Sequence, residues 1–338
     1  MTDAGLTAEL WREAEAARAA GDQPAARALL SRLLAGKPHH VAALKAMAAL
    51  ARDAGERQGY DLRVADAMVE ETLDLVLTLQ DGPMRAKAEA LARRALAERP
   101  DSPRAHRTLM DFLRRHGRLG EADAVARTAP PWTGPDAPLA IAPCLVVEDF
   151  LPAERHRETL DFALARAAQF ERAMVSGADH EWKVEPEARI AQAAYDIDSL
   201  RRWFVPLLQA RLPAILARLG MAPFEQGEIE LQLTAYNDGE YYRTHADRDE
   251  AGLVKRLLTF VYYFNRMPKA FEGGDLALYD GDAAAGLFSS KHFTKIGPVD
   301  NRLLVFPSNA QHEVLTVRCP SGAYEDSRFT LNGWFNRI

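Results

Sequence analysis

Hydrophobic residues follow two different periods along this chain, and the change falls near residue 130. Up to residue 129, apolar residues recur three and four positions apart in a background of Ala, Leu, Arg and Glu, which are strong helix formers. After Gly227, apolar and polar residues alternate in short runs instead. The first period predicts α-helices and the second predicts β-strands, so the two halves differ in fold class.

The helical half contains two similar segments, which suggests an internal repeat. The segment AARALLSRLLAGKP, residues 25–38, is echoed by AEALARRALAERP, residues 88–100, and each predicts a helix that ends at a proline after a basic residue. The two prolines are 62 residues apart, close to two periods of a helix-turn-helix repeat. Gly21, Gly55 and Gly117 fall where the first helix of each pair turns into the second.

In these features residues 1–129 resemble tetratricopeptide repeats, although the aromatic positions of that family are mostly missing and the middle repeat is degenerate. Stacked repeats of this kind leave a concave surface that commonly holds an extended peptide. The resemblance therefore implies a peptide or protein partner held by the repeats. A helical bundle that only supports the second half is the alternative.

A proline-rich linker is predicted at residues 130–143, and residues 144–338 form the second domain. It begins with a strand and turn at LVVEDFLP, followed by two predicted helices near residues 153–170 and 197–219.

Predicted strands then follow one another without crossover helices. In IELQLTAY, the apolar and polar residues would face opposite sides of the strand, with Ile229, Leu231 and Leu233 on one side and Gln232, Thr234 and Tyr236 on the other. Further strands are predicted at residues 257–265, 275–279, 302–307, 313–317 and 328–335. Short strands between Gly/Pro turns indicate an antiparallel jelly roll or barrel. The expected fold class is α+β multidomain, with an all-α repeat domain followed by a β domain with supporting helices.

Composition narrows the possible partners and the compartment. The chain has 48 acidic and 42 basic side chains, a net charge of −6, and no basic stripe interleaved with aromatics, which disfavours nucleic acid. Cys144 and Cys319 are the only cysteines, which argues against a disulfide framework or cysteine-bound zinc. The first residues lack the features of a secretory peptide, and no apolar run reaches membrane-spanning length. We therefore expect a cytoplasmic protein with no membrane partner.

The candidate chemistry centres on His245-x-Asp247, where a strand is predicted to end. Imidazole and carboxylate ligands that leave open positions suit a non-haem Fe(II) oxygenase. A third ligand has two candidates, His292 and His312. We prefer His312, because it follows a strand and tight turn and begins the next strand, whereas His292 is predicted in a long polar loop.

Residues 139–338 resemble the prolyl-hydroxylase branch of the Fe(II)- and 2-oxoglutarate-dependent oxygenases. The resemblance rests on Tyr236-x-x-Gly239-x-x-Tyr242-x-x-His245-x-Asp247, followed in order by FEGGDLALY, LLVFPSNAQHEV and SRFTLNGWF. It implies a double-stranded β-helix (jelly-roll) fold, Fe(II), 2-oxoglutarate and O₂ as cofactors, and His245, Asp247 and His312 as the iron ligands. The implied 2-oxoglutarate contacts are Arg328, which pairs with the distal carboxylate, together with Thr330 and Tyr236.

One spacing departs from the family. Arg328 lies 16 residues after His312, with RCPSGAYED between them, which makes Arg318 the rival anchor. We prefer Arg328 because RFTLNGWF is the better match to the final strand of the family. Gly273 and Gly274 are expected to form the tight turn before the strand near Asp275.

The resemblance implies hydroxylation of a protein or peptide side chain, most simply a prolyl one, with release of succinate and CO₂. Because a carboxylate is retained at Asp247, hydroxylation is favoured over halogenation. The alternatives are a hydroxylase of a free amino acid or small metabolite, and a non-catalytic adaptor. Residues 170–190 and 280–295 are candidate loops over the substrate, or solvated connectors. The four tyrosines Tyr241, Tyr242, Tyr262 and Tyr263 are interpreted as packing.

Overall fold

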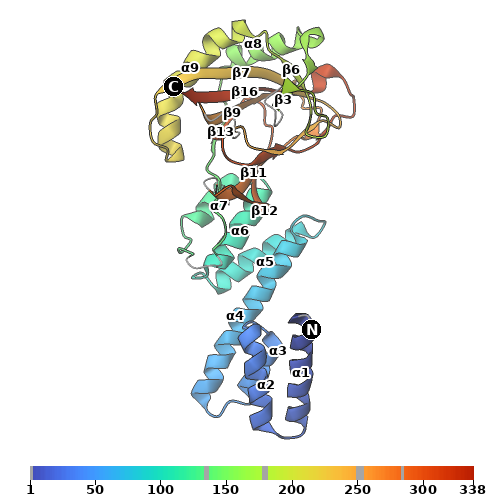
Figure 1. Ribbon diagram of the computed structural model, residues 1–338, viewed down its shortest axis with the longest axis vertical. Coiled ribbons are helices and arrows are strands. Elements are labelled where there is room, and N and C mark those ends of the chain that lie inside the picture. The colour runs from blue at the N-terminus through green and yellow to red at the C-terminus, as the bar shows by residue number, and fades with distance from the viewer. Residues whose placement is uncertain (1–2, 133–136, 177–181, 249–254, 283–284) are drawn as a thin grey trace. The chain divides into compact units, whose positions relative to one another are not determined.

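The computed structural model of this chain describes residues 3–132, 137–176, 182–248, 255–282 and 285–338. The chain divides into two compact units (Figure 1). The first contains Met1–Leu113 and Leu119–Thr133, and the second contains Arg114–Arg118 and Gly134–Ile338. The domain limits 1–129, 130–143 and 144–338 stay predictions.

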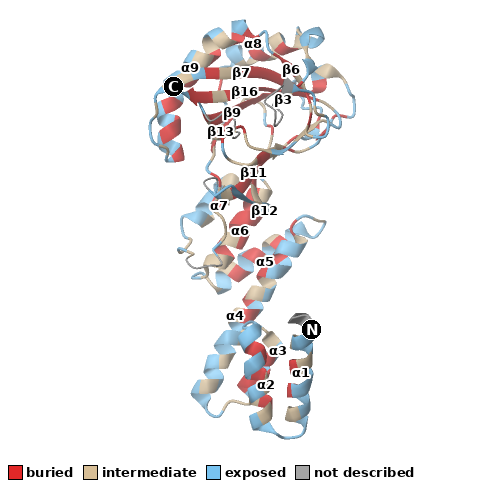
Figure 2. Cartoon of the chain, in the orientation of Figure 1, coloured by how far each residue is buried: buried red, intermediate tan, exposed pale blue. Residues whose placement is uncertain are grey.

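The first unit is helical, as its apolar period predicts. Its helices are α1 (Asp3–Ala19), α2 (Gln23–Gly36), α3 (Val41–Ala49), α4 (Ala54–Leu79), α5 (Arg85–Glu98), most of α6 (Pro103–Arg115) and α7 (Leu119–Ala126). Each amphipathic helix buries one face and exposes the other (Figure 2). Buried leucines and alanines of α1, α2 and α3 form one cluster, and residues of α4 to α7 form others.

The two similar segments, residues 25–38 and 88–100, also resemble each other in structure. The helices α2 and α5 each contain 14 residues, and each ends at a basic residue with nearly the same backbone angles: φ −133° and ψ 77° at Lys37, φ −135° and ψ 72° at Arg99. Gly21 and Gly117, with φ of 76° and 70°, follow the ends of α1 and α6. The assignment to tetratricopeptide repeats stays a prediction.

The second unit is dominated by antiparallel strands. Its helices are α8 (Ala153–Leu164) and α9 (Asp198–Leu219). Its strands are β1 (Leu145–Val147), β2 (Glu171–Arg172), β3 (Val175–Ser176), β4 (Trp182–Lys183), β5 (Arg189–Ile190), β6 (Gln192–Ala194), β7 (Gln226–Tyr236), β8 (Tyr241–His245), β9 (Arg256–Phe264), β10 (Glu272–Gly273), β11 (Leu276–Asp282), β12 (Leu287–Ile296), β13 (Arg302–Pro307), β14 (His312–Val314), β15 (Val317–Arg318) and β16 (Arg328–Arg337).

Two sheets of the described residues position the site. The larger has the order β1-β13-β9-β16-β7-β6-β2, and the smaller has the order β12-β11-β14-β8-β5. The helices α8 and α9 cover one face of the larger sheet (Figure 1). Phe260, Tyr262 and Phe264 of β9 pack in that core, whereas Thr259 and Val261 alternate with them and line a cavity. Both faces of β9 are therefore buried, which explains its almost continuous apolar run.

Several predicted segments require correction. Residues 280–282 and 287–295 are strand and not loop, because β11 extends to Asp282 and pairs with β12, while residues 283–284 lie outside the described part. His292 lies within β12, an edge strand of its sheet, and the polar composition of this strand reflects its partial exposure. The connector at residues 170–190 contains short strands. Residues 177–181 of this connector lie outside the described part. The first predicted helix ends at Leu164 rather than Phe170, and residues 313–317 form two strands with a break.

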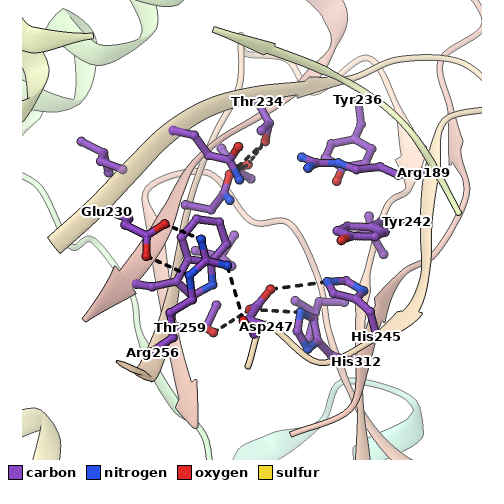
Figure 3. Close-up of a pocket in the computed structure, with 18 of the residues that line it drawn as sticks. Arg189, Glu230, Thr234, Tyr236, Tyr242, His245, Asp247, Arg256, Thr259 and His312 are labelled. Atoms are coloured by element: carbon purple, nitrogen blue, oxygen red, sulfur yellow. Dashed lines mark hydrogen bonds and ion pairs between the residues drawn. The ribbon is translucent and has the colours of Figure 1, made fainter. Parts of the chain in front are cut away.

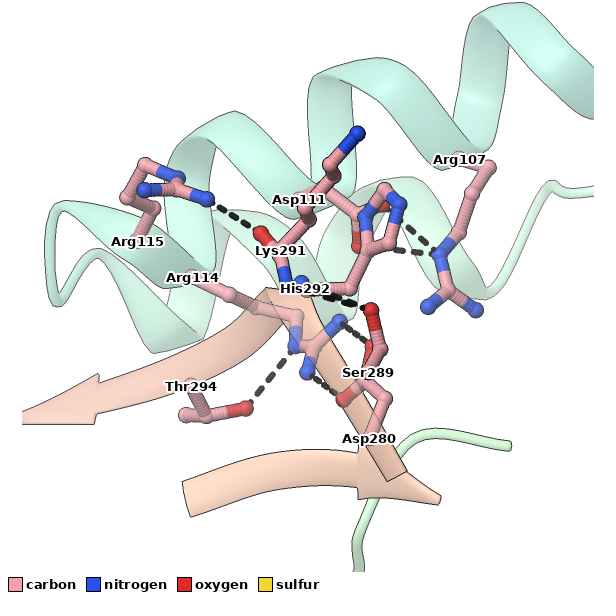
Figure 4. Close-up of polar contacts among 9 residues, drawn as sticks. All are labelled: Arg107, Asp111, Arg114, Arg115, Asp280, Ser289, Lys291, His292 and Thr294. Atoms are coloured by element: carbon pink, nitrogen blue, oxygen red, sulfur yellow. Dashed lines mark hydrogen bonds and ion pairs between the residues drawn. The ribbon is translucent and has the colours of Figure 1, made fainter. Parts of the chain in front are cut away.

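Residues 114–118 belong to the second unit through a buried polar contact (Figure 4). The Arg114 guanidinium forms an ion pair with the fully buried Asp280 carboxylate, and its Nε donates to Thr294 Oγ1 at 2.9 Å. Arg115 donates to the Lys291 carbonyl and lies 4.3 Å from the centre of the Phe293 ring. Within the second unit, these contacts join Arg114 and Arg115 to the hairpin of β11 and β12.

Among the residues described above, no helix is both long and apolar enough to cross a membrane. The cytoplasmic location stays a prediction.

Candidate active site

A cavity of about 560 Å³ lies in the second unit, and three side chains that could hold a metal ion converge at one side of it (Figure 3). His245 is the last residue of β8, His312 is the first of β14, and the two are direct cross-strand partners. Asp247 follows His245 by two residues. One ligand atom from each of the three lies within 4.8 Å of the others. The structure thus brings together the three residues that the sequence singled out, and His292 is not among the cavity-lining residues.

Hydrogen bonds orient both histidine rings. The Nδ1 of His245 lies 2.7 Å from the Arg243 carbonyl oxygen, and the Nδ1 of His312 lies 3.0 Å from the Ala310 carbonyl oxygen. Each ring therefore carries its proton on Nδ1, which leaves the Nε2 lone pair for a metal ion. The two Nε2 atoms lie 3.6 and 3.5 Å from the Asp247 carboxylate oxygens. This arrangement fits a divalent cation, because three donor atoms converge with their other polar atoms already bonded.

The Asp247 carboxylate is held from the other side by β9 and the turn after β13. Thr259 donates its hydroxyl to Asp247 Oδ2 at 2.6 Å. The backbone N–H of Asp247 donates to the Ser308 carbonyl at 3.0 Å. Side chain and backbone are both fixed, so the carboxylate is positioned before a metal ion binds.

The protonation states in the cavity also suit a metal ion. Burial raises the pKa of Asp247, but the neighbouring His312 and His245 and the Thr259 hydroxyl outweigh burial and hold the pKa below its usual range. Burial and the adjacent His245 ring lower the pKa of His312 to about 4, despite the Asp247 carboxylate. At neutral pH the aspartate is therefore ionised and His312 is neutral, which are the forms that bind metals.

We expect Thr259→Val to weaken Fe(II) binding about 10-fold to 100-fold, as is typical when a hydrogen bond to a metal ligand is lost. The reason is that valine keeps the shape of threonine but cannot orient the Asp247 carboxylate. Anaerobic titration with Fe(II) measures the affinity. Thr244→Val is the matched control, because the exposed Thr244 hydroxyl donates to Glu313 and not to a metal-binding residue. Equal affinities for the two variants would contradict the assignment.

A buried arginine lies elsewhere in the same cavity. Arg328, the first residue of β16, is 1% exposed and pairs across the sheet with Tyr236 of β7. Its Nε donates to the Gly274 carbonyl at 2.8 Å, whereas its Nη2 is buried without a hydrogen-bond partner. An unpaired N–H of a buried guanidinium is costly unless a ligand accepts its hydrogen bond. A carboxylate is the ligand that fits such a donor.

The rival arginine is far more exposed. Arg318 does not line the cavity and pairs with Glu272, with side chains that are 70% and 74% exposed. The longer spacing between His312 and Arg328 is absorbed by residues 319–327, which include a short 3₁₀ turn at Tyr324–Asp326. Both β14 and β16 therefore line the cavity in spite of the added residues.

The other two predicted cosubstrate residues also line the cavity. Tyr236 lies beside Arg328, whose guanidinium carbon is 5.0 Å from the centre of its ring. Thr330 lies on the same face of β16 as Arg328, and its hydroxyl is 2.5 Å from that of Thr234. Tyr263, a residue expected to serve packing, places a buried hydroxyl without a partner near Arg328. Burial raises the pKa of Tyr263 to about 12, so the phenol keeps its proton.

Two glycines allow Arg328 to reach its position. Gly273 and Gly274 have φ of 69° and 66°, as expected for a tight turn before β11. A Cβ atom on Gly274 would lie 2.6 Å from Arg328 Cδ and 2.8 Å from Val317 Cγ2. Glycine at position 274 is thus required by both the backbone and the arginine.

We expect Gly274→Ala to lower the free energy of unfolding by about 1–3 kcal/mol more than Gly220→Ala does, because of overpacking against Arg328. Gly220 has the same φ of 66°, and a Cβ atom there would meet no other atom within 4 Å, so it isolates the backbone cost. Denaturant unfolding of both variants measures the difference. Equal losses would mean that the Arg328 side chain shifts without cost.

Sequence reasoning missed other cavity residues. Arg256 of β9 pairs with Glu230 of β7, and its guanidinium carbon lies 3.7 Å from the centre of a Trp334 ring. Tyr242 stacks on His245 with ring centres 3.5 Å apart, and Arg189 of β5 lies over the Tyr242 ring. The alternation of β7 and β16 signals Glu230 and Trp334. Arg256 reaches the cavity only through a register irregularity in the pairing of β9 with β16, and nothing in the sequence signals Arg189.

Two antiparallel sheets, with a His-Asp-His cluster and a buried arginine in one cavity, define a class of metal-dependent enzyme site. Comparison with known families agrees, because residues 231–336 match the model of the 2OG-Fe(II) oxygenase superfamily. The second unit therefore carries a 2OG-Fe(II) oxygenase domain. The cofactors of this family are Fe(II) and 2-oxoglutarate, with O₂.

Individual relatives were found by sequence and by structure. A protein described as an uncharacterized PKHD-type hydroxylase of Synechocystis sp. is 45% identical over 131 residues, which are 38% of this chain and 43% of that protein. The match thus spans less than half of this relative. A Pseudomonas putida prolyl-4-hydroxylase aligns with a TM-score of 0.43 and 23% identity over 58% of this chain and 94% of that one. A Trichoplax adhaerens prolyl hydroxylase in complex with a hypoxia inducible factor peptide has a TM-score of 0.42 and 19% identity, over 58% and 84% of the chains.

Proposed function

We propose that this protein is an Fe(II)- and 2-oxoglutarate-dependent hydroxylase of a protein or peptide side chain, most simply a prolyl one. The observation that carries the proposal is the presence in one cavity of three converging ligand atoms and an unpaired buried arginine. The PKHD-type hydroxylase relative supports hydroxylation. The helical first unit, with its resemblance to tetratricopeptide repeats, supports a polypeptide substrate, and we propose that the two sheets form a jelly roll.

Each residue has a defined task in this proposal. His245, Asp247 and His312 hold Fe(II). The hydrogen bonds at the two Nδ1 atoms orient the histidine rings, and the hydrogen bond from Thr259 orients the Asp247 carboxylate. Arg328 binds the distal carboxylate of 2-oxoglutarate, beside the Thr330 and Tyr236 side chains. When bound by these residues, Fe(II) and 2-oxoglutarate would supply the oxidising chemistry, in which one oxygen atom of O₂ enters a substrate C–H bond and 2-oxoglutarate is converted to succinate and CO₂.

The chain itself supplies binding and orientation. The ionised Asp247 and neutral His312 provide ligands without a prior proton transfer at neutral pH. Arg328 is held by the Gly274 carbonyl and by its tyrosine neighbours, so its free N–H points to a fixed place. The preorganised donors lower the cost of ordering the cosubstrate.

The test is an anaerobic titration with Fe(II) and 2-oxoglutarate, followed by measurement of succinate release in air. The wild type is expected to bind both and to release succinate, and His245→Ala is expected to do neither. Peptide and free amino acid pools are then compared for 2-oxoglutarate-dependent addition of one oxygen atom by mass spectrometry. A wild type that binds neither Fe(II) nor 2-oxoglutarate contradicts the enzymatic function, and oxidation of free amino acids alone contradicts the polypeptide substrate.

A further inference from the structure

A second buried arginine lines the cavity and has no task in the proposed function. Arg189 is 6% exposed and lies on the short strand β5. Its Nε is buried without a hydrogen-bond partner, and its Nη1 makes a long contact of 3.4 Å with the Met174 carbonyl. The guanidinium also hydrogen-bonds with the Tyr236 phenol oxygen, so its contacts are with neutral groups and its Nε keeps a free donor.

No carboxylate balances this cation within the described part of the chain, where the ion pairs do not include Arg189. The titratable groups that face it are the phenols of Tyr236, Tyr242 and Tyr195. A buried guanidinium without an anionic partner destabilises the free protein. Such a group is stabilised when an anion enters the cavity.

The position of Arg189 separates it from the metal-binding side chains. Arg189 and Tyr242 are direct cross-strand partners of β5 and β8, and the guanidinium carbon lies 4.8 Å from the centre of the Tyr242 ring. The same ring stacks on His245 at 3.5 Å. Figure 3 shows the Tyr242 ring between Arg189 and His245. One aromatic layer therefore lies between this cation and the nearest metal-binding residue.

The contacts assigned to 2-oxoglutarate in the proposed function argue against it as this anion. In the proposed function the distal carboxylate of 2-oxoglutarate occupies Arg328, and its other end reaches the metal. Both ends of 2-oxoglutarate are therefore accounted for, and Arg189 is left as an additional cation on the other side of Tyr236 and Tyr242. The remaining anion is one that the primary substrate brings.

We propose that Arg189 binds a carboxylate of the primary substrate, so that the hydroxylated compound carries a carboxylate close to the oxidised carbon. This inference rests on the proposed function and names the substrate class for the same site. The guanidinium fork, with its parallel Nε and Nη donors, matches a carboxylate. Such a carboxylate belongs either to a terminal residue or free amino acid, or to an acidic side chain beside the target.

The test uses matched probes on the full chain with Fe(II) and saturating 2-oxoglutarate under anaerobic conditions. Calorimetric titration compares N-acetyl-L-proline with its amide, and an internal-proline peptide amide carrying Glu with the same peptide carrying Gln. In at least one of these two pairs, we expect the acid to bind at least tenfold more tightly than the neutral compound. The first pair reports a terminal carboxylate and the second an acidic side chain.

Two variants assign the preference to Arg189. In Arg189→Gln the preference for the acid is expected to disappear, and in Arg189→Lys it is expected to persist in weakened form, because lysine keeps the charge but not the fork. The affinity for 2-oxoglutarate is expected to stay within twofold in both. The wild-type comparison of acid with neutral probe requires no variant, so it decides the point even if Arg189→Gln does not fold.

The outcomes separate the two proposals. If wild type fails to bind 2-oxoglutarate, the proposed function fails and the inference fails with it. If wild type binds 2-oxoglutarate but shows no acid preference in either pair, or keeps it in Arg189→Gln, only the inference is overturned. The same holds if Arg189→Gln weakens 2-oxoglutarate binding and leaves the probes unaffected, because Arg189 then serves the cosubstrate.

Discussion

Replacement of His312 by alanine is expected to lower Fe(II) affinity by at least a hundredfold and to abolish succinate release. Loss of a residue that only orients a metal ligand already costs 10-fold to 100-fold, so loss of a ligand costs at least as much. His312 is 4% exposed and its Nε2 faces Asp247 at 3.5 Å, so no surface group replaces it. Anaerobic Fe(II) titration and a succinate assay measure the two effects.

His292→Ala is the matched control for this expectation. His292 is the other candidate that the sequence offered, and it lies on β12 outside the residues that line the cavity. We expect this variant to keep Fe(II) affinity and turnover within about twofold of wild type. If His292→Ala loses iron and His312→Ala retains it, the proposed ligand set is wrong.

Arg328→Gln is expected to raise the KM for 2-oxoglutarate about 10-fold to 100-fold, with little change in Fe(II) affinity. The magnitude is that of losing a charge-assisted hydrogen bond in a buried site, about 1.5–3 kcal/mol. Glutamine retains a donor near the Gly274 carbonyl, so a loss of binding reflects the missing charge and fork. Succinate release as a function of 2-oxoglutarate concentration gives the KM.

Arg318→Gln distinguishes the two arginines that the sequence left in competition. The Arg318 side chain is 70% exposed and pairs with Glu272, so its removal is expected to leave the KM within twofold. A large rise in KM for Arg318→Gln, with a normal value for Arg328→Gln, would reverse the assignment. Equal effects in both would point to a general loss of structure, which an unfolding curve detects.

The strand pattern was predictable because it depends on neighbours along the chain. Alternation in residues 229–236 placed Thr234 and Tyr236 on the face that lines the cavity and Leu233 in the core below the helices. Polar content misled the prediction for residues 280–295, because an edge strand with one exposed side has the composition of a loop. A polar composition indicates that a segment is exposed to solvent, but an exposed segment can still pair with a neighbouring strand.

The residues of the candidate site also differ in whether the sequence alone predicts them. His245, Asp247 and His312 stand out because their residue types and spacing carry the chemistry, whatever surrounds them. Thr259 does not stand out, because a threonine in a strand is ordinary until Asp247 is found 2.6 Å from its hydroxyl. The role of such a residue depends on a hydrogen-bond partner that is distant in the sequence.

From its sequence alone, this protein has a helical first half, a strand-rich second half and a candidate iron site, because periodicity and motif spacing act over short stretches of chain. Only the tertiary structure decided between Arg318 and Arg328 as the buried cation in the cavity. It alone revealed Arg189 over the Tyr242 ring, with a buried Nε that has no hydrogen-bond partner. Burial and pairing join strands that are distant in the chain, so no local pattern encodes them.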